Sequence, residues 1–176
     1  ILWSDHFVKK ERRFREVLHF AKDLVAKNNN SLILIGQRAR FANQNLGWIE
    51  FGKEVSEIEK TKVFKFKKLI YRPTLEQAEK FLETDNFAWN PGYFVTTPKF
   101  LLSQFEKFTP DLAKSLKKIE NAIGKKVFEK TLETIYPTLE KISFDNAILE
   151  KIDSKYVSVI AADLGWSDVG AWEALK

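Results

Sequence analysis

The chain has 176 residues, enough for one domain or for part of a larger one, and 44% of them are hydrophobic, which excludes a disordered protein. The net charge of +5 and the pI of about 9.2 suit an anionic ligand such as a phosphate and do not by themselves indicate nucleic acid. With no Cys and only two His, the chain cannot form disulfides or Cys- or His-based metal clusters, so a metal would bind carboxylate oxygens, as Mg²⁺ does.

No apolar run is long enough to span a membrane and no signal peptide is visible, so a cytoplasmic protein without a membrane partner is expected. The chain begins with Ile and contains no Met. This favours a start that was removed or a portion of a longer product. The alternative is that the protein naturally contains no Met.

The first elements predict a strand–helix–strand unit. Residues 1–3 are predicted to form the end of a buried strand. Residues 10–27 are predicted as a helix because apolar side chains recur at helical spacing. The wholly apolar run 31–36 predicts a strand covered on both faces, which is typical of a parallel sheet.

The later elements complete an α/β pattern. Strands are predicted near 47–51, 57–69, 94–96 and 156–161. Helices are predicted after Thr74, where Gln77 would complete a capping box, within 98–136, over 144–152 and after Gly170. Together these predict a Rossmann-like α/β fold, with a mostly parallel mixed sheet, flanking helices and a helical insertion. In such sheets ligands bind beyond the carboxyl ends of the strands, which points to Asp5 and the segment 163–170.

Asp5 and Asp168 are candidate metal ligands. Each follows a predicted strand, and two carboxylates at strand ends of one sheet could share a Mg²⁺ between the phosphates of two anionic substrates. The alternative is that each Asp caps a helix or a turn, and spacing alone favours that alternative.

Four further positions or segments are open to a binding or a structural interpretation. Asn90 and Gly92 are predicted in a turn, where Asn could bond a sugar hydroxyl and Gly could let a ligand approach the backbone. Arg72 could clamp a phosphate or simply be an exposed strand-end residue. The basic and aromatic segment 62–72 could be a nucleic-acid platform, but its spacing equally fits a sheet edge. His6 could position a ligand or be a structural histidine.

The order and spelling of several motifs resemble those of the mannose-1-phosphate guanylyltransferases, a family of sugar-phosphate nucleotidyltransferases with a GT-A-like fold. Residues 4–7 (SDHF) resemble the family's ADH segment, 46–50 (LGWIE) its YGYIE, and 72–73 (RP) its EKP. Residues 87–94 (FAWNPGYF) resemble YxWNSGMF, 143–151 (SFDNAILEK) resemble SIDYAVMEK, and 165–172 (GWSDVGAW) resemble GWSDVGSW. The motifs are collinear from end to end, and the last one together with WN-x-G is the most specific.

The resemblance implies a reaction of GTP with mannose 1-phosphate that yields GDP-mannose and pyrophosphate, with no nucleic acid involved. Asp5 and Asp168 would hold Mg²⁺, Arg72 would bind the sugar phosphate, and the sugar pocket would be lined or supported by Gly47, Asn90, Gly92 and Asp145. Residues 1–176 would then be a partial nucleotidyltransferase domain that carries the sugar-phosphate-binding part. The oligomeric state stays open, with a homodimer among the alternatives.

The departures from the family pattern leave three readings. The family's glycine-rich GGxGxRLxP loop is absent and would lie upstream of Ile1. Tyr71 and Asn43 stand where relatives have carboxylates. The chain therefore belongs either to an active guanylyltransferase, to a non-catalytic homologue that binds a nucleotide sugar or a partner, or to an enzyme with another sugar 1-phosphate as substrate.

Overall fold

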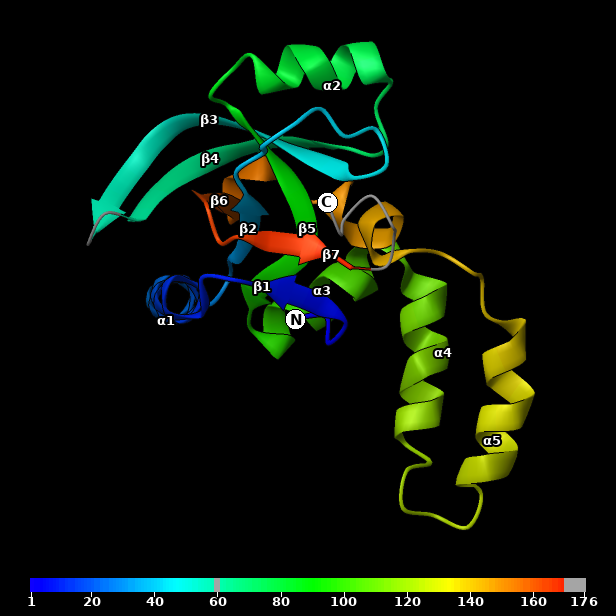
Figure 1. Cartoon of the computed structure of the whole chain (residues 1–176). Helices are drawn as coiled ribbons and strands as arrows, with labels where there is room; N and C mark the ends of the chain where they lie inside the picture. The colour runs from blue at the N-terminus through cyan, green and yellow to red at the C-terminus, as the bar shows by residue number, and fades with distance from the viewer. Residues whose placement is uncertain (59–60, 170–176) are drawn as a thin grey trace. The chain divides into compact units, whose positions relative to one another are not determined.

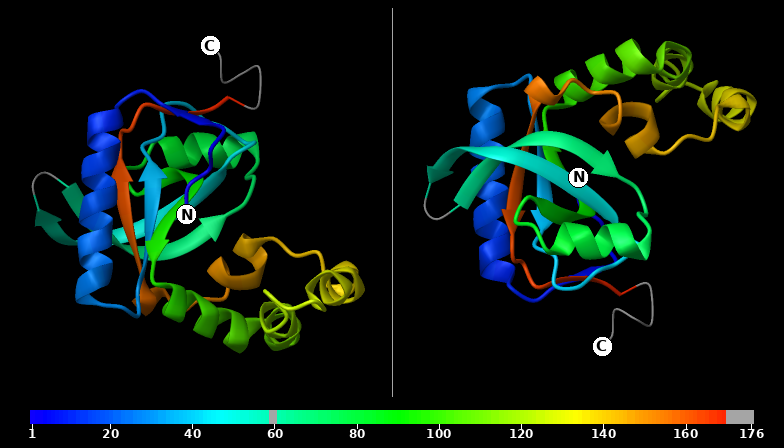
Figure 2. Two further views of the ribbon diagram at one scale, coloured as in Figure 1. Left: turned by 90° about the horizontal axis from the view of Figure 1, so that it is seen from below. Right: turned by 90° about the horizontal axis from the view of Figure 1, so that it is seen from above.

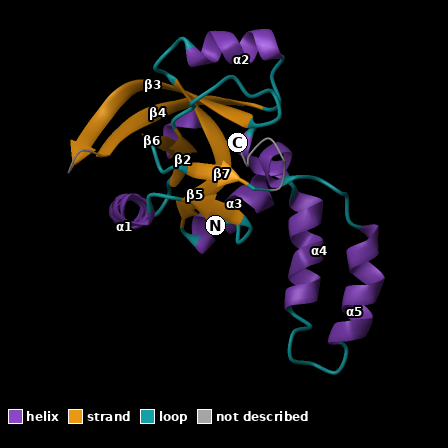
Figure 3. Cartoon of the chain, in the orientation of Figure 1, coloured by secondary structure: helices purple, strands orange, loops and turns teal. Residues whose placement is uncertain are grey.

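The computed structural model describes residues 1–58 and 61–169. The chain forms two compact units, each described here by itself: the first combines Ile1–Thr97 with the segment from Asp153 onward, and the second is Pro98–Ile152. Figure 3 shows that the strands belong to the first unit and that the described residues of the second are helices and loops.

Within the described residues, five strands of the first unit are hydrogen-bonded in a closed ring, in the order β2-β5-β3-β4-β6. A separate two-stranded ribbon pairs β1 with β7. The ribbon strands are β1 (His6–Val8) and β7 (Trp166–Asp168). The ring strands are β2 (Leu32–Gln37), β3 (Gly47–Ile58), β4 (Thr61–Ile70), β5 (Phe87–Thr96) and β6 (Val157–Ala162), as seen in Figure 1.

The predicted mostly parallel sheet is wrong. Among the described strands only β2 and β6 pair in parallel, and every other pair is antiparallel. The apolar run of β2 is indeed buried at every position, but closure of the ring and the cover of a helix bury it, not a doubly covered parallel sheet. An all-apolar strand sequence indicates burial on both faces. It does not indicate whether the neighbouring strands run parallel or antiparallel.

Two helices cover the ring. Helix α1 (Glu11–Lys27) agrees with the predicted helix and packs Val17, Ala21 and Val25 into the core, against β2, β5 and β6. Both views of Figure 2 show α1 running alongside β2 and β6. Helix α2 (Leu75–Leu82) begins with the predicted capping box, in which Thr74 and Gln77 exchange hydrogen bonds of 3.3 and 2.9 Å.

Two local predictions are wrong. Residues 1–3 are exposed and lie outside the strands, although the amino group and carbonyl of Ile1 bond the backbone of Phe94 at 2.7 and 3.3 Å. The predicted turn at 90–92 lies inside β5, because Gly92 takes a positive φ of 74° that lets the strand continue through an irregularity. The helix predicted after Gly170 falls outside the described residues.

The second unit confirms the predicted helices of 98–136. It contains α3 (Pro98–Phe108), α4 (Pro110–Glu120), α5 (Phe128–Ile135) and a short π-helix at Asp145–Leu149. None of the helices in the described part of the chain has the length and apolar character needed to cross a membrane.

Candidate active site

The β1–β7 ribbon brings Asp5 and Asp168 to the same end of the first unit. In the antiparallel register His6 lies opposite Asp168, so that Asp5 comes directly before the partner of Asp168. Successive side chains of a strand point to opposite faces, so the register brings the two segments together and does not by itself fix the distance between the two carboxylates. The ribbon therefore places the segments that carry the two predicted metal ligands side by side, although they come from opposite ends of the chain.

His6 is held beside these carboxylates by two aromatic residues. The indole N–H of Trp166 donates to His6 Nδ1 at 3.0 Å, and the Tyr93 hydroxyl lies 3.1 Å from the same nitrogen. A neutral ring that accepts at Nδ1 carries its proton on Nε2. Burial raises the pKa of Tyr93, and the negative charge of Asp5 raises it further, while the hydrogen bond from Trp166 acts in the opposite direction.

The protein oxygens near the β1–β7 ribbon would supply only some of the ligands that Mg²⁺ needs. Within residues 1–58 and 61–169, no group of three or more His, Cys, Asp and Glu side chains gathers as a metal site. Mg²⁺ is commonly held by one or two carboxylates, with substrate phosphates and waters as the remaining ligands. Asp5 and Asp168 are the two carboxylates predicted for such a site.

The predicted sugar-binding residues of the first unit also come together. Gly47 on β3 lies opposite Asn90 on β5. The Asn90 side-chain oxygen accepts the Gly92 N–H at 3.0 Å, which fixes the carboxamide orientation. A Cβ added at Gly47 would lie 3.5 Å from Asn90 Cβ and 3.9 Å from the Ile70 carbonyl, so the space beside this glycine is open to one further atom.

Arg72 follows β4 in a strained conformation. Its φ is 44°, and no other non-Gly residue of the described chain has a positive φ. Its guanidinium lies 5.2 Å from the centre of the exposed Tyr71 ring. The pairing of Trp48 with Ile70 puts the 71–72 segment next to Gly47. Backbone strain at an exposed cation beside an open glycine suits a ligand contact.

Strand β5 joins the two groups of residues. Tyr93 reaches His6 beside Asp5, and Asn90 on the same strand lies opposite Gly47. The indole of Trp3 covers Gly92, where an added Cβ would collide with it. Asp145 belongs to the second unit, where it opens the π-helix, and its role in the sugar pocket remains a prediction.

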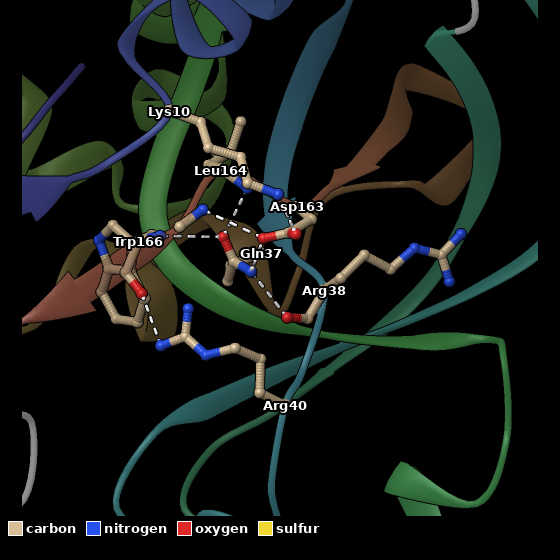
Figure 4. Close-up of polar contacts among 8 residues, drawn as sticks. Lys10, Gln37, Arg38, Arg40, Asp163, Leu164 and Trp166 are labelled. Atoms are coloured by element: carbon tan, nitrogen blue, oxygen red, sulfur yellow. Dashed lines mark hydrogen bonds and ion pairs between the residues drawn. The ribbon is translucent and has the colours of Figure 1, made fainter. Parts of the chain in front are cut away.

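Sequence reasoning missed two polar residues that hold the segment before Asp168 (Figure 4). The Gln37 side chain bonds the backbone N–H groups of Leu164 and Trp166, and Arg40 Nη2 donates to the Trp166 carbonyl at 3.1 Å. The Arg40 guanidinium also lies 5.5 Å from the centre of the Trp89 ring. The one signal in the sequence is a glutamine directly after the wholly apolar run 31–36.

Asp163 begins this segment and is strongly paired. Its carboxylate accepts from Lys10, from Gly165 N–H at 3.1 Å and from Gln37 at 3.3 Å. The hydrogen bond from Lys10 lowers the pKa of Asp163, and the bonds from Gly165 and Gln37 act in the same direction against desolvation. Asp163 is therefore a structural anchor of the chain that leads to Asp168.

Comparison with known proteins places the chain in a family. A family model described as "Nucleotidyl transferase" matches residues 1–176. The chain belongs to the nucleotidyl transferase family. Two of the nucleotidyl transferase relatives, both named mannose-1-phosphate guanylyltransferase, are 28% identical (Escherichia coli) and 24% identical (Sinorhizobium fredii), each over 99% of this chain.

Two solved structures share the nucleotidyl transferase fold of this chain. A Thermus thermophilus protein described as a mannose-1-phosphate geranyltransferase matches 99% of this chain and 47% of its own, with a TM-score of 0.79 and 24% identity. A Helicobacter pylori protein described as a mannose-6-phosphate isomerase matches 94% and 61%, with a TM-score of 0.72 and 23% identity. The chain spans about a third of the curated relatives' own length, 37% and 33% for the two named above.

Proposed function

We propose that this chain forms the sugar-phosphate side of an enzyme that transfers GMP from GTP to mannose 1-phosphate and releases pyrophosphate. The observation that carries the proposal is the β1–β7 register, which pairs the Asp5 and Asp168 regions at one end of the first unit. The opposed Gly47 and Asn90, with the 71–72 segment next to Gly47, are the residues that would bind the sugar phosphate. The relatives named mannose-1-phosphate guanylyltransferase support the choice of sugar and nucleotide.

The chemistry needs positioning and charge neutralisation more than a protein nucleophile. A phosphate oxygen of mannose 1-phosphate forms a bond to the α-phosphorus of GTP, and the bond from that phosphorus to the oxygen bridging to the β-phosphate breaks, so that pyrophosphate leaves with its electron pair. Bound Mg²⁺ would neutralise charge on the two phosphate groups. Asp5 and Asp168 would hold the ion, Arg72 would bind the sugar phosphate, and Asn90 would bond a sugar hydroxyl.

The experiment is pyrophosphate release by the intact protein, including any sequence that flanks this chain, with Mg²⁺, GTP and mannose 1-phosphate. Glucose 1-phosphate and other nucleoside triphosphates serve as alternative substrates. We expect release that requires both GTP and mannose 1-phosphate. Release with a different sugar phosphate would replace mannose by that sugar. Absence of release with every pair would favour a non-catalytic homologue, to be tested by binding of GDP-mannose.

The Asp168→Asn variant tests the metal assignment. We expect kcat to fall at least about 100-fold, because an amide cannot offer Mg²⁺ the same charge. Asp23→Asn, an exposed carboxylate on α1, is the matched control and should keep its rate. Near-normal turnover of Asp168→Asn would remove Asp168 from the metal site.

A further inference from the structure

Gln37 is completely buried and makes as many hydrogen bonds as a carboxamide allows. Its side-chain oxygen accepts from Leu164 N–H at 2.9 Å and from Trp166 N–H at 3.2 Å. Its side-chain nitrogen donates to the Arg38 carbonyl at 2.7 Å and to the Asp163 carboxylate at 3.3 Å. Figure 4 shows these bonds converging on one side chain.

Among the partners of Gln37, the Trp166 N–H lies on the edge of β7 that has no neighbouring strand among the described residues, and Leu164 comes just before β7. On its other edge β7 pairs with β1, and the contact continues as Lys9 and Lys10 N–H groups bond the carbonyls of Gly165 and Leu164 at 3.1 and 3.0 Å. Both backbone polar groups of Trp166 are taken by side chains, the N–H by Gln37 and the carbonyl by Arg40. Gln37 and Arg40 thus occupy the place of a strand.

We infer that Gln37 is a positioning residue that sets where the Asp168 carboxylate lies relative to Asp5. This inference rests on the proposed function, in which these two carboxylates share a cation. Asp168 is two residues beyond Trp166 on the same short strand, so that a displacement of the Trp166 backbone is transmitted to it. A two-stranded ribbon is weakly stable by itself, and the buried carboxamide ties it to the ring of strands through β2.

Only a carboxamide satisfies all four groups. A carboxylate at position 37 could accept from Leu164 and Trp166 but would face two further acceptors, the Arg38 carbonyl and the Asp163 carboxylate. An apolar side chain would leave two buried N–H groups without their acceptor. The chemistry of the site therefore specifies Gln at this position.

The test compares Gln37→Met with Gln104→Met in the intact protein. Gln104 is also buried but lies in the second unit, where it bonds Ser103 at 3.1 Å. Three quantities are measured: amide hydrogen exchange at Leu164 and Trp166, binding of Mn²⁺ alone by electron paramagnetic resonance, and kcat and KM for pyrophosphate release.

For Gln37→Met we expect faster exchange at both amides, Mn²⁺ affinity and kcat lower by about 10–100-fold, and a KM for mannose 1-phosphate that changes much less. Gln104→Met should leave all three quantities as in the wild type. Faster exchange with unchanged Mn²⁺ affinity and unchanged kcat would overturn the inference and leave the proposed function intact.

Two further outcomes separate this inference from the proposed function. If the wild type binds Mn²⁺ but turns over no substrate pair, the proposed function fails, and the Mn²⁺ affinity of Gln37→Met still decides whether Gln37 positions the carboxylates. If Gln37→Met does not fold, Gln37→Glu replaces it, since it keeps the shape and the acceptor oxygen. We expect its Mn²⁺ affinity to lie between those of the wild type and Asp168→Asn, and an affinity equal to the wild type would overturn the inference.

Discussion

Two buried tryptophans, Trp48 and Trp89, lie opposite each other on β3 and β5 but differ in one hydrogen bond. The indole N–H of Trp48 donates to the Asn43 carbonyl at 2.8 Å. The indole N–H of Trp89 is buried without a hydrogen-bond partner among the described residues. Replacement by Phe removes similar volume at both positions but breaks a hydrogen bond at only one.

We therefore expect Trp48→Phe to lower the free energy of unfolding by about 1 kcal/mol more than Trp89→Phe, because only the first leaves a carbonyl without its donor. Urea unfolding of the two variants measures the difference. An equal or larger loss of unfolding free energy for Trp89→Phe would mean that the Trp89 N–H has a hydrogen-bond partner in solution.

The Asp163 pKa predicts a dependence of stability on pH. Its pKa is lowered from 3.8 because Lys10 donates to the charged carboxylate. The folded state therefore favours ionised Asp163, and the resulting stabilisation is complete above pH 3.8 and is lost as pH falls through the lower folded pKa. Both side chains are about half exposed, so that the stabilisation should be about 1 kcal/mol or less.

Asp163→Asn should accordingly be less stable than the wild type near pH 6 and approach it in stability below the folded pKa. Urea midpoints measured from pH 2 to pH 6 test this. Lys10→Met removes the other partner of the same ion pair. Like Asp163→Asn, this variant should be less stable than the wild type near pH 6 and approach it at low pH. A difference that grows toward low pH would contradict the assigned direction of the pKa shift.

At the scale of elements, Gly36 on β2 leaves no room for a side chain against β5. A Cβ added there would lie 2.8 Å from Ala88 Cβ, closer than packed side chains allow. We expect Gly36→Ala to destabilise the chain by about 1–3 kcal/mol, because one strand must shift at the irregular β2–β5 register. Thermal unfolding measures this.

Gly52→Ala on β3 is the matched control. The nearest atom to its added Cβ would be Cε of the flexible Lys67 side chain at 3.3 Å, and the loss should stay below about 1 kcal/mol. Equal losses for the two variants would show that strand glycines, and not the close approach at Gly36, determine the effect.

The elements also show what a sequence can predict. The periodicity of 10–27 and the Thr74–Gln77 capping box are local signals, and both are confirmed by α1 and α2. Strand direction is not local, because an apolar run such as β2 looks the same beside parallel and antiparallel neighbours. Gly92 looks like a turn residue, whereas its positive φ serves an irregularity inside β5.

The sequence predicts which residues belong to the candidate site better than it predicts how they are arranged in space. Asp5 and Asp168 are predicted from their positions after strands and from family motifs, but the meeting of the segments that carry them depends on the β1–β7 pairing of the two ends of the chain. Gln37 gave no motif, since its importance comes from four partners that are mostly distant in sequence.

At the scale of the whole molecule, the first unit contains its own core. The buried cluster around Trp48, Trp89 and Trp166 draws on the first unit alone within the described residues. Thr96 and Val157 lie on either side of Leu32 in β2, so that the two strands that flank 98–152 in the sequence are about 10 Å apart at this level, two strand spacings.

We expect the first unit to fold when residues 98–152 are replaced by a flexible linker of about six Gly and Ser residues, which spans that gap. A cooperative thermal transition and dispersed amide resonances would support this. A broad, non-cooperative transition would mean that the first unit needs the second in order to fold.

The parallel pairing of β2 with β6 has a consequence for folding during synthesis on the ribosome. Strands β2, β3, β4 and β5 are synthesised long before β6, so the ring stays open while more than half of the chain emerges. During that interval β2 and β4 each present an unpaired edge to other nascent chains. Chaperone demand should therefore be greatest before Val157 leaves the exit tunnel and should fall once β6 closes the ring.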